Sequence, residues 1–442
     1  MKAKAVLIGA IAVSVAGYIW LVWGDADRPS GDWMRTFLWV SQLLTVCYLA
    51  ALWAARKINL GLFHPRLFQV VLIAAVVMRL VVLVGADQKD YLSDDVYRYI
   101  WEGKLVVNGY NPFLIAPDEM AGSALADDVI YPEINFPDLP TIYPPLSQYS
   151  FALAYLIGGD SLYGFKMLSL LADLTTALLL LFFIHVYSLP RWTILIYLLS
   201  PLVMIEFLFS SHLDIFALPF LVAGLIFHNK KMGTAVGICL GLATLVKFLA
   251  LFFLPLLFLH LASRKRLGMV VGFVVVLVLG YLPFALSAGW ETFGSLWKYL
   301  GEWEYNGSVY EIIKLAAGKE ISRYICMALF AIAAALATFY RYRTANLSTR
   351  ALFLFGAYIV FAPAIFPWYL VWLFPFLLYK RSIAMLAMTG TILLSYNVMV
   401  GYYENGVWTP FGVARIIEYV LFYALLAYEF TRYRRRSVPA QI

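Results

Sequence analysis

The feature that most constrains this chain is a succession of long apolar runs separated by short breaks. Runs of about 17–25 apolar residues are long enough to cross a bilayer as helices. Hydrophobic residues make up 63% of the 442 residues and charged ones only 13%, which excludes an ordinary soluble globular protein. Because backbone polar groups must be paired within lipid, we expect these runs to form spanning helices. The runs fall near residues 4–23, 35–55, 67–85, 164–187, 193–209, 214–228, 233–246, 249–262, 268–287, 322–340, 351–365, 367–379, 383–400 and 412–431.

Basic residues at alternate breaks predict the orientation of the chain. Cytoplasmic loops are enriched in Lys and Arg, and here such residues occur at every second break. If all of these breaks are cytoplasmic, both termini lie inside and the chain crosses the membrane about 12–14 times. The sequence therefore predicts an all-α polytopic protein of the plasma or inner membrane, a single domain over residues 1–442. The basic residues are Lys2, Lys4, Arg56, Lys57, Arg66, Arg191, Lys230, Lys231, Arg264, Lys265, Arg266, Arg341, Arg343, Arg350, Lys380, Arg381, Arg432, Arg434, Arg435 and Arg436.

This distribution of basic residues also bears on possible partners. The net charge of +7 is spread over short breaks between apolar runs, so it predicts topology and no nucleic-acid binding. The three cysteines are scattered through apolar segments and have no metal-ligand spacing. We therefore expect membrane lipids as partners, no certain cofactor, and no metal site, although a divalent metal stays possible.

Three loops of appreciable length are predicted on the extracytoplasmic side, at about residues 24–34, 86–163 and 288–321, and the second is by far the longest. The loop 86–163 contains an apolar run at about 146–157, which is short for a crossing and, if it crossed, would invert the orientation of all later loops. We expect this run to be re-entrant or interfacial, and the loop to contain short helices. Long loops in compact proteins are usually functional, so residues 86–163 are predicted to be a catalytic loop.

The loop 86–163 opens with a cluster of charges in an otherwise weakly charged chain. Charge beside a bilayer is costly unless it is hydrated or paired, so such clusters usually mark function. A carboxylate in this position can act as a general base toward a hydroxyl nucleophile. The cluster reads Ser93-Asp94-Asp95-Val96-Tyr97-Arg98-Tyr99-Ile100-Trp101-Glu102-Gly103.

The predicted topology brings further polar and aromatic residues to the same face from other hairpins. Arg98, Lys247 and Arg415 could hold a phosphate there. His212 and Asp214 lie at another outer turn. Carboxylates that can act as a base, cations that can hold a phosphate, and aromatic and amide side chains that can bind a sugar together predict transfer of a sugar from a lipid phosphate. The aromatic and amide residues suited to sugar recognition are Tyr97, Trp101, Asn108, Asn111, Trp368 and Tyr369.

Each of these residues also has a plain structural interpretation. Trp368 and Tyr369 could be anchors in an aromatic belt, and Lys247 could extend to the lipid headgroups. His212 could be a satisfied polar residue in a turn. Asp173 and Glu206, deeper in their helices, could be paired structural groups.

Three motifs give the loop a resemblance to a known family. The cluster at residues 93–103 is followed by Asn108-Gly109-Tyr110-Asn111-Pro112-Phe113 and by Ile142-Tyr143-Pro144-Pro145-Leu146. Together they resemble the signature of GT-C polyprenyl-phosphate-sugar-dependent glycosyltransferases, most of all the bacterial α-mannosyltransferases that use polyprenyl-phosphate mannose. Later motifs occur in an order and spacing similar to that family: His212-Leu213-Asp214, Leu245-Val246-Lys247 and Pro367-Trp368-Tyr369.

The resemblance implies a GT-C fold and an inverting mannosyl transfer. The donor would be a polyprenyl-phosphate sugar and the acceptor a glycolipid or lipid-linked glycan. In the family a loop Asp deprotonates the acceptor hydroxyl, which favours Asp95 as base with Asp94 as helper. The remaining site residues implied as pocket lining are Tyr97, Glu102, Asn111, Tyr143, His212, Asp214, Trp368 and Tyr369.

Two other function classes stay open at this point. A polymerase or ligase of lipid-linked glycans would share the outward site but use a diphosphate-linked donor. A lipid-sugar flippase or transporter would be expected to show internal symmetry and helices broken at the bilayer midplane. Neither feature is evident in the sequence.

Overall fold

The computed structural model describes residues 1–24, 30–85, 92–340, 346–408 and 412–437, except for the side chains of residues 85 and 433–437. The topology residues Arg341 and Arg343, and the side chains of Arg434, Arg435 and Arg436, therefore lie outside the described part. Within it the secondary structure is helical, apart from isolated bridges of Tyr305 and Asn306 with Ala364. The prediction of an all-α protein is confirmed.

The α-helices are α1 (Lys2–Trp23), α2 (Gly31–Lys57), α3 (Pro65–Gly85), α4 (Asp95–Val107), α5 (Pro145–Gly158), α6 (Tyr163–Val186), α7 (Leu195–Leu198), α8 (Pro201–Val203), α9 (Leu218–Asn229), α10 (Gly233–Val246), α11 (Leu254–His260), α12 (Ser263–Ala288), α13 (Gly294–Glu302), α14 (Val309–Phe339), α15 (Leu347–Phe361), α16 (Phe374–Tyr379), α17 (Ile383–Thr391), α18 (Val398–Asn405) and α19 (Val413–Ser437). The shorter helices are the π-helix η4 (Met204–Phe209) and the 3-10 helices η1 (Pro117–Met120), η2 (Tyr131–Glu133), η3 (Arg191–Ile194), η5 (Leu213–Phe216), η6 (Phe248–Phe253), η7 (Gly289–Phe293), η8 (Pro367–Leu373) and η9 (Ile392–Asn397).

Many of these helices are long and apolar enough to cross a membrane. Among the described residues there are seven such segments, and eight if the bent pair Arg191–Leu198 and Pro201–Phe209 forms one span. Five further apolar helical segments are shorter. The polytopic character is thus confirmed, and the predicted number of crossings is approached only if the shorter segments cross as well. The seven are Lys2–Trp23, Gly31–Lys57, Pro65–Val84, Tyr163–Val186, Ser263–Glu302, Val309–Phe339 and Ile383–Asn405.

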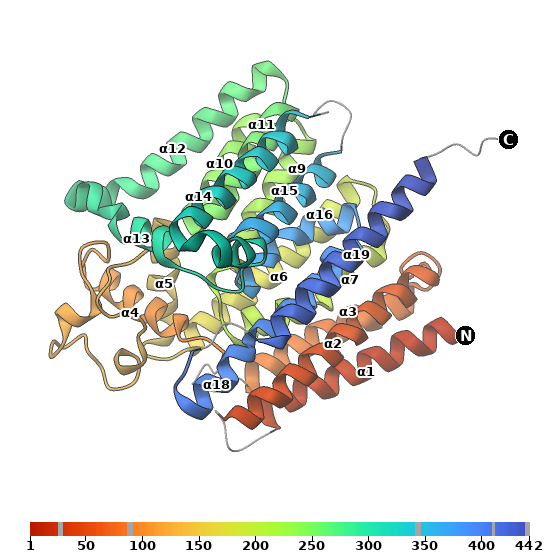
Figure 1. The fold of residues 1–442 in the computed structure, drawn as a ribbon, viewed down its shortest axis with the longest axis horizontal. Helices are drawn as coiled ribbons and strands as arrows, with labels where there is room; N and C mark the ends of the chain where they lie inside the picture. Colours follow the sequence, from red (N-terminus) through yellow and green to blue (C-terminus); the bar gives the residue numbers. More distant parts are fainter. Residues whose placement is uncertain (25–29, 86–91, 341–345, 409–411, 438–442) are drawn as a thin grey trace.

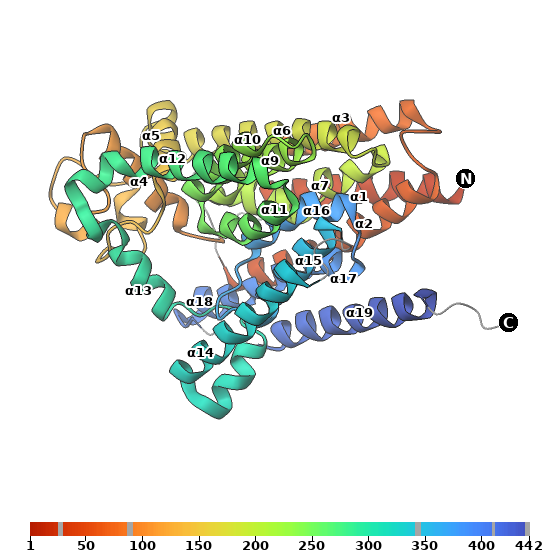
Figure 2. The ribbon, with the colours of Figure 1, turned by 90° about the horizontal axis from the view of Figure 1, so that it is seen from above.

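The long helices lie side by side, and the two ends of this bundle differ (Figures 1 and 2). The start of α1 and the end of α19 lie at one end, which we call the terminal end. The loop with α4 and α5 lies at the opposite end, together with α13 and α18, and we call it the loop end. The described part of the predicted loop, residues 92–163, thus lies at the end opposite the start of α1 and the end of α19, and the side of the membrane that each end faces stays a prediction.

The helices α4 and α5 pack closely within the loop. A Cβ at Gly103 of α4 would collide with the carbonyl oxygen of Phe151 in α5, so glycine permits this approach. The α5 helix has 14 residues. At about 1.5 Å per residue such a helix is well short of the roughly 30 Å hydrocarbon core. Ser147 in its first turn donates a 2.8 Å hydrogen bond to the Val246 carbonyl at the end of α10, which fixes the loop to the bundle.

A buried ion pair joins three helices in the interior. Arg79 Nε of α3 lies 2.5 Å from Asp173 Oδ2 of α6, and both side chains are fully buried. Tyr197 of α7 donates to Asp173 Oδ1 at 2.7 Å, and Arg79 also donates to the Leu198 carbonyl at 2.9 Å. The structural alternative for Asp173 is therefore the correct one.

Candidate active site at the loop end

The two adjacent carboxylates lie at the start of α4. Asp94 is the residue before the helix and Asp95 is its first residue. The Asn135 side-chain amide donates to Asp94 Oδ1 at 2.7 Å and to Asp95 Oδ1 at 2.8 Å. The Tyr99 hydroxyl donates to Asp95 Oδ2 at 3.3 Å. A helix N-terminus also favours negative charge, so this position holds a carboxylate without a direct cationic partner.

The surroundings raise the pKa of both carboxyl groups. Asp94 keeps some contact with solvent, but surrounding protein atoms partly desolvate its carboxyl group. This desolvation, and to a smaller extent repulsion from Asp95, raises the pKa of Asp94 to about 6. Desolvation also raises the pKa of the half-buried Asp95, against the opposing effects of Asn135, of the Lys247 charge and of Tyr99. A carboxylate with a raised pKa is a stronger base once ionised, which suits proton abstraction near neutral pH.

An ion pair from two other hairpins faces Asp95. Lys247 Nζ lies 2.5 Å from Asp214 Oδ2, and Trp372 Nε1 donates to Asp214 Oδ1 at 2.9 Å. The Lys247 ammonium also lies 4.4 Å from the centroid of the Tyr369 ring. Lys247 follows the end of α10 in extended conformation, and its charge acts on Asp95. The fold therefore places Lys247 in contact with Asp214 and Tyr369, and near enough to Asp95 for its charge to act there. That these residues face the outer side stays a prediction.

His212 and Trp368 lie next to this pair but stack on each other. Their ring centroids are 3.6 Å apart, and Phe366 stacks on Trp368 with a centroid separation of 4.6 Å. With both faces of its indole near aromatic rings, Trp368 presents no free face to a sugar. His212 Nδ1 lies 3.0 Å from Glu206 Oε2, so the pairing considered for Glu206 is present.

Local backbone irregularity positions His212. The preceding turn is the π-helix η4, a form of helix that often occurs at functional sites, and Ser211 has a φ of 60°. The His212 Nε2 atom is buried and has no hydrogen-bond partner among the described residues. Tyr369, beyond Trp368, shares a 2.7 Å hydrogen bond with the Tyr299 hydroxyl of α13.

Arg98 and Glu102 form a structural network instead of an open phosphate site. Arg98 Nε donates to Glu102 Oε1 at 2.8 Å, and its remaining nitrogens donate to backbone carbonyls of the loop. Glu102 Oε2 accepts from Thr141 and from Gln148, each at 2.7 Å. Four of the five guanidinium donors are engaged, so the contacts of Arg98 do not support phosphate binding. The carbonyls belong to Asn135, Phe136 and Leu139.

Four other predicted residues of the loop also serve its structure. Asn111 donates to the Phe284 carbonyl at 3.0 Å and to Ser287 at 2.8 Å, which ties the loop to α12. Tyr143 packs edge-on against Tyr99 with ring centroids 5.0 Å apart. Tyr97 and Trp101 are buried. A fully buried Trp101 cannot stack on a sugar, so it is removed from the residues predicted to bind a sugar.

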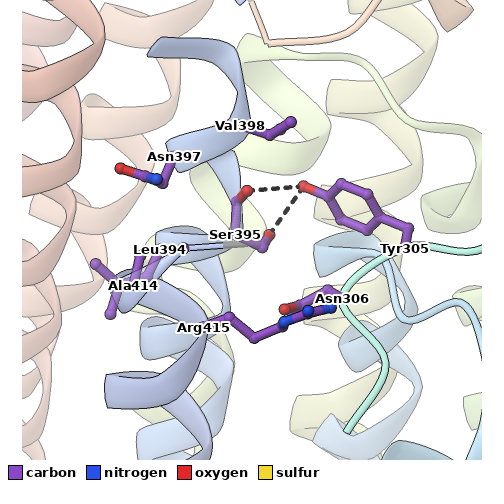
Figure 3. Close-up of a pocket in the computed structure, with 9 residues that line it drawn as sticks. Tyr305, Asn306, Leu394, Ser395, Asn397, Val398, Ala414 and Arg415 are labelled. Atoms are coloured by element: carbon purple, nitrogen blue, oxygen red, sulfur yellow. Dashed lines mark hydrogen bonds between the residues drawn. The ribbon is translucent and has the colours of Figure 1, made fainter. Parts of the chain in front are cut away.

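Arg415 lies in a separate pocket, shown in Figure 3, and not beside Lys247. Its side chain extends along Asn306, whose amide donates to Glu418 Oε1 at 3.0 Å. Arg415 also lies 3.9 Å from Glu311. Tyr305, at the rim of this pocket, stacks on Phe366 at 4.5 Å, so only a short series of aromatic rings separates the pocket from Trp368. Arg415 and Lys247 are therefore not brought together as one phosphate clamp.

Several residues of the site were not predicted. Asn135 bridges both carboxylates, Tyr299 holds Tyr369, and Trp372 holds Asp214. Each lies far along the chain from its partner, and no local motif marks Asn135 or Tyr299. Trp372 is the exception, since it lies four residues after Trp368 in the same aromatic turn.

The described residues also bear on metal binding. No group of three or more His, Cys, Asp or Glu side chains within the described ranges is arranged to hold a metal ion.

The part of the chain that matches a known family contains most residues of this candidate site. Residues 91–263, about two fifths of the chain, match the family model described as "Alpha-(1->6)-mannopyranosyltransferase, N-terminal domain". This segment contains Asp94, Asp95, Asn135, Asp214 and Lys247. Comparison with curated proteins and with solved structures gives no match. The family match confirms the predicted resemblance to mannosyltransferases and the prediction that this membrane protein is a glycosyltransferase.

Proposed function

We propose that this membrane glycosyltransferase, which matches a mannosyltransferase family, transfers mannose from a polyprenyl-phosphate donor. The acceptor is a glycolipid or a lipid-linked glycan. The transfer takes place at the loop end, on the extracytoplasmic side of the plasma or inner membrane. The position of both termini at the opposite end of the bundle, where the basic breaks are expected, supports this side.

One observation carries the proposal. Asp95 is held by Asn135 and Tyr99 in a half-buried position where the charge of Lys247 reaches it. A base and a cation on opposing elements fit a reaction in which a hydroxyl loses a proton while a phosphate leaves.

In the proposed reaction Asp95 takes the proton of the acceptor hydroxyl. The hydroxyl oxygen forms a bond to the anomeric carbon, and the bond from that carbon to the phosphate oxygen breaks. The electron pair leaves with the polyprenyl phosphate, and the configuration at the anomeric carbon inverts. The Lys247 ammonium stabilises the charge that develops on the departing phosphate.

The choice of Asp95 over Asp94 rests on their surroundings. Asp95 has two side-chain donors and lies within the field of Lys247, whereas Asp94 is more exposed and shares only Asn135 with it. Repulsion from Asp95 contributes to the raised pKa of Asp94, so Asp94 takes up a proton more readily and is the poorer candidate for a base that must be ionised.

The experiment is sugar transfer from polyprenyl-phosphate mannose to a glycolipid acceptor by purified variants. Loss of a general base costs about 10²–10⁴-fold in rate, so Asp95→Asn should fall by that amount and Asp94→Asn by much less. Asn preserves the side-chain shape at both positions, which makes the two variants matched controls. Folded Asp95→Asn protein with near-normal activity would refute the assignment, and lipid flipping without transfer by the unmodified protein would favour a flippase.

A further inference from the structure

A cavity at the terminal end of the bundle lies on the opposite side from the proposed active site. It has an empty volume of about 530 Å³, including space open to solvent. It lies between the ends of α6 and α9, the start of α15 and the end of α16. Because α6 begins just after α5 at the loop end and ends at the terminal end, this cavity is remote from Asp95 (Figure 1).

The lining of the cavity combines an apolar wall with donors. Phe183, Leu225 and Phe376 supply apolar surface, and His228 and Lys231 supply nitrogen atoms. Among the described residues that line it, none is acidic. A concave, basic and partly apolar surface between helices is the kind that binds the phosphate headgroup of an anionic lipid.

His228 is the clearest sign that a ligand is expected. Its side chain is 6% exposed, and its Nε2 atom has no hydrogen-bond partner among the described residues. A buried polar atom without a partner costs about 1–3 kcal/mol, so such atoms usually have a ligand or water. The charge of Lys231 acts on this ring and on the neighbouring His260, which itself contacts Arg350 at 2.5 Å.

The start of α15 adds a second source of positive potential. Asn346 caps this 15-residue helix, with its side-chain oxygen accepting from the Ser348 amide at 2.8 Å. Asn346, Leu347 and Ser348 all line the cavity. A helix N-terminus offers unpaired amides and the positive end of the helix dipole to an anion.

We propose that this cavity binds the phosphate-bearing headgroup of an anionic lipid. Lys231 and His228 contact the phosphate, the start of α15 faces it, and the apolar wall takes the glycerol and upper acyl chains. The site is independent of the transfer reaction at the loop end.

The test is equilibrium binding of short-chain lipids to the purified full-length protein in detergent. The probes are dioctanoyl phosphatidylglycerol, the zwitterionic dioctanoyl phosphatidylcholine, and inorganic phosphate. We expect phosphatidylglycerol to bind more tightly than phosphatidylcholine. Competition by inorganic phosphate would show that the phosphate group alone is recognised, and lack of competition would show that the lipid headgroup is the ligand.

Two neighbouring lysines provide a matched control. Lys231 lines the cavity, whereas Lys230 lies over the Phe182 ring at 5.1 Å and is not part of the lining. Lys231→Gln should raise the Kd for phosphatidylglycerol about fivefold, which corresponds to about 1 kcal/mol per cation, and Lys230→Gln should change it less than about twofold. His228→Phe, which removes the ring nitrogens, should weaken binding in the same direction.

Three results would overturn the proposal. These are equal affinity for the two lipids, equal effects of the two lysine variants, and no measurable binding of phosphatidylglycerol. Lys231 is exposed, so Lys231→Gln should fold normally, and circular dichroism of both lysine variants checks that it does.

Discussion

Two ion pairs of this protein have similar chemistry but different surroundings. The Arg79–Asp173 pair is fully enclosed between α3, α6 and α7, and Tyr197 and backbone carbonyls take up its remaining hydrogen-bonding capacity. The Lys247–Asp214 pair is enclosed only on the Asp214 side, and the Lys247 side chain is 17% exposed. A buried pair with all partners present stabilises helix packing, whereas a cation that keeps an open side can meet a ligand.

The difference separates structural from functional charge in this chain. Both pairs join distant elements and both would be costly to break. Of the two cations in these pairs, Lys247 is the one whose charge acts on Asp95, a loop carboxylate with a raised pKa. We therefore expect changes at the enclosed pair to affect stability and changes at the open pair to affect activity.

Arg79→Ala should give the largest effect. Removing one partner of a buried pair typically costs about 3–5 kcal/mol, since it leaves the other charge buried alone. We expect a large drop in the thermal unfolding midpoint in detergent, with unchanged activity per folded molecule. The double variant Arg79→Met with Asp173→Leu should recover much of the loss. An unchanged midpoint for Arg79→Ala would break the comparison.

Lys247→Gln should reduce activity more than it reduces stability. A hydrogen bond to a charged group contributes about 1.5–3 kcal/mol, so transfer should slow by about 10–100-fold. Asp214 keeps the Trp372 donor, so the unfolding midpoint should fall less than in Arg79→Ala. Lys247→Arg keeps the charge and should retain more activity than Lys247→Gln. Equal activity of the Gln variant and the unmodified protein would exclude Lys247 from the site.

Arg98→Lys tests whether Arg98 is a structural residue or a phosphate ligand, and its expected effect on stability is smaller than that of Arg79→Ala. The planar guanidinium of Arg98 reaches Glu102 and three carbonyls at once, which a single ammonium cannot do. We expect a loss of stability of about 1–3 kcal/mol and no specific rise in the donor KM. A raised donor KM in protein of normal stability would instead restore Arg98 as a phosphate ligand.

The helical class could be predicted from the sequence and is confirmed, whereas the catalytic role of the loop stays a prediction and the use of the individual cations could not be foreseen. Apolar length and alternate basic breaks do not depend on tertiary contacts, so they predicted the helices and a short α5. Arg98, Lys247 and Arg415 look equivalent as isolated cations. Their roles diverge because Arg98 meets loop carbonyls and Arg415 lies beside Asn306 and Glu418, contacts that depend on packing of distant segments.

The surroundings of Asp94 and Asp95 also depend on contacts between distant segments that the sequence does not reveal. Their motif was visible in the sequence, but the amide that bridges them is Asn135, 40 residues beyond Asp95 and without a recognisable motif. The stacking of Trp368 between His212 and Phe366 likewise follows from two hairpins meeting. The sequence alone could not show whether Trp368 stacks on other side chains or on a bound sugar.

The central claim is that Asp95 is the base and that Lys247 acts on it, and the pH dependence of kcat/KM tests this most directly. Desolvation raises the pKa of Asp95 and the Lys247 charge lowers it, so activity should fall as pH drops through the pKa of the ionised base. The phosphodiester donor does not titrate in this range. In Lys247→Gln the positive charge that lowers the pKa of Asp95 is absent, so the pKa of Asp95 should rise and the acidic limb of the profile should move to higher pH. An acidic limb at the same pH in both proteins would contradict the account.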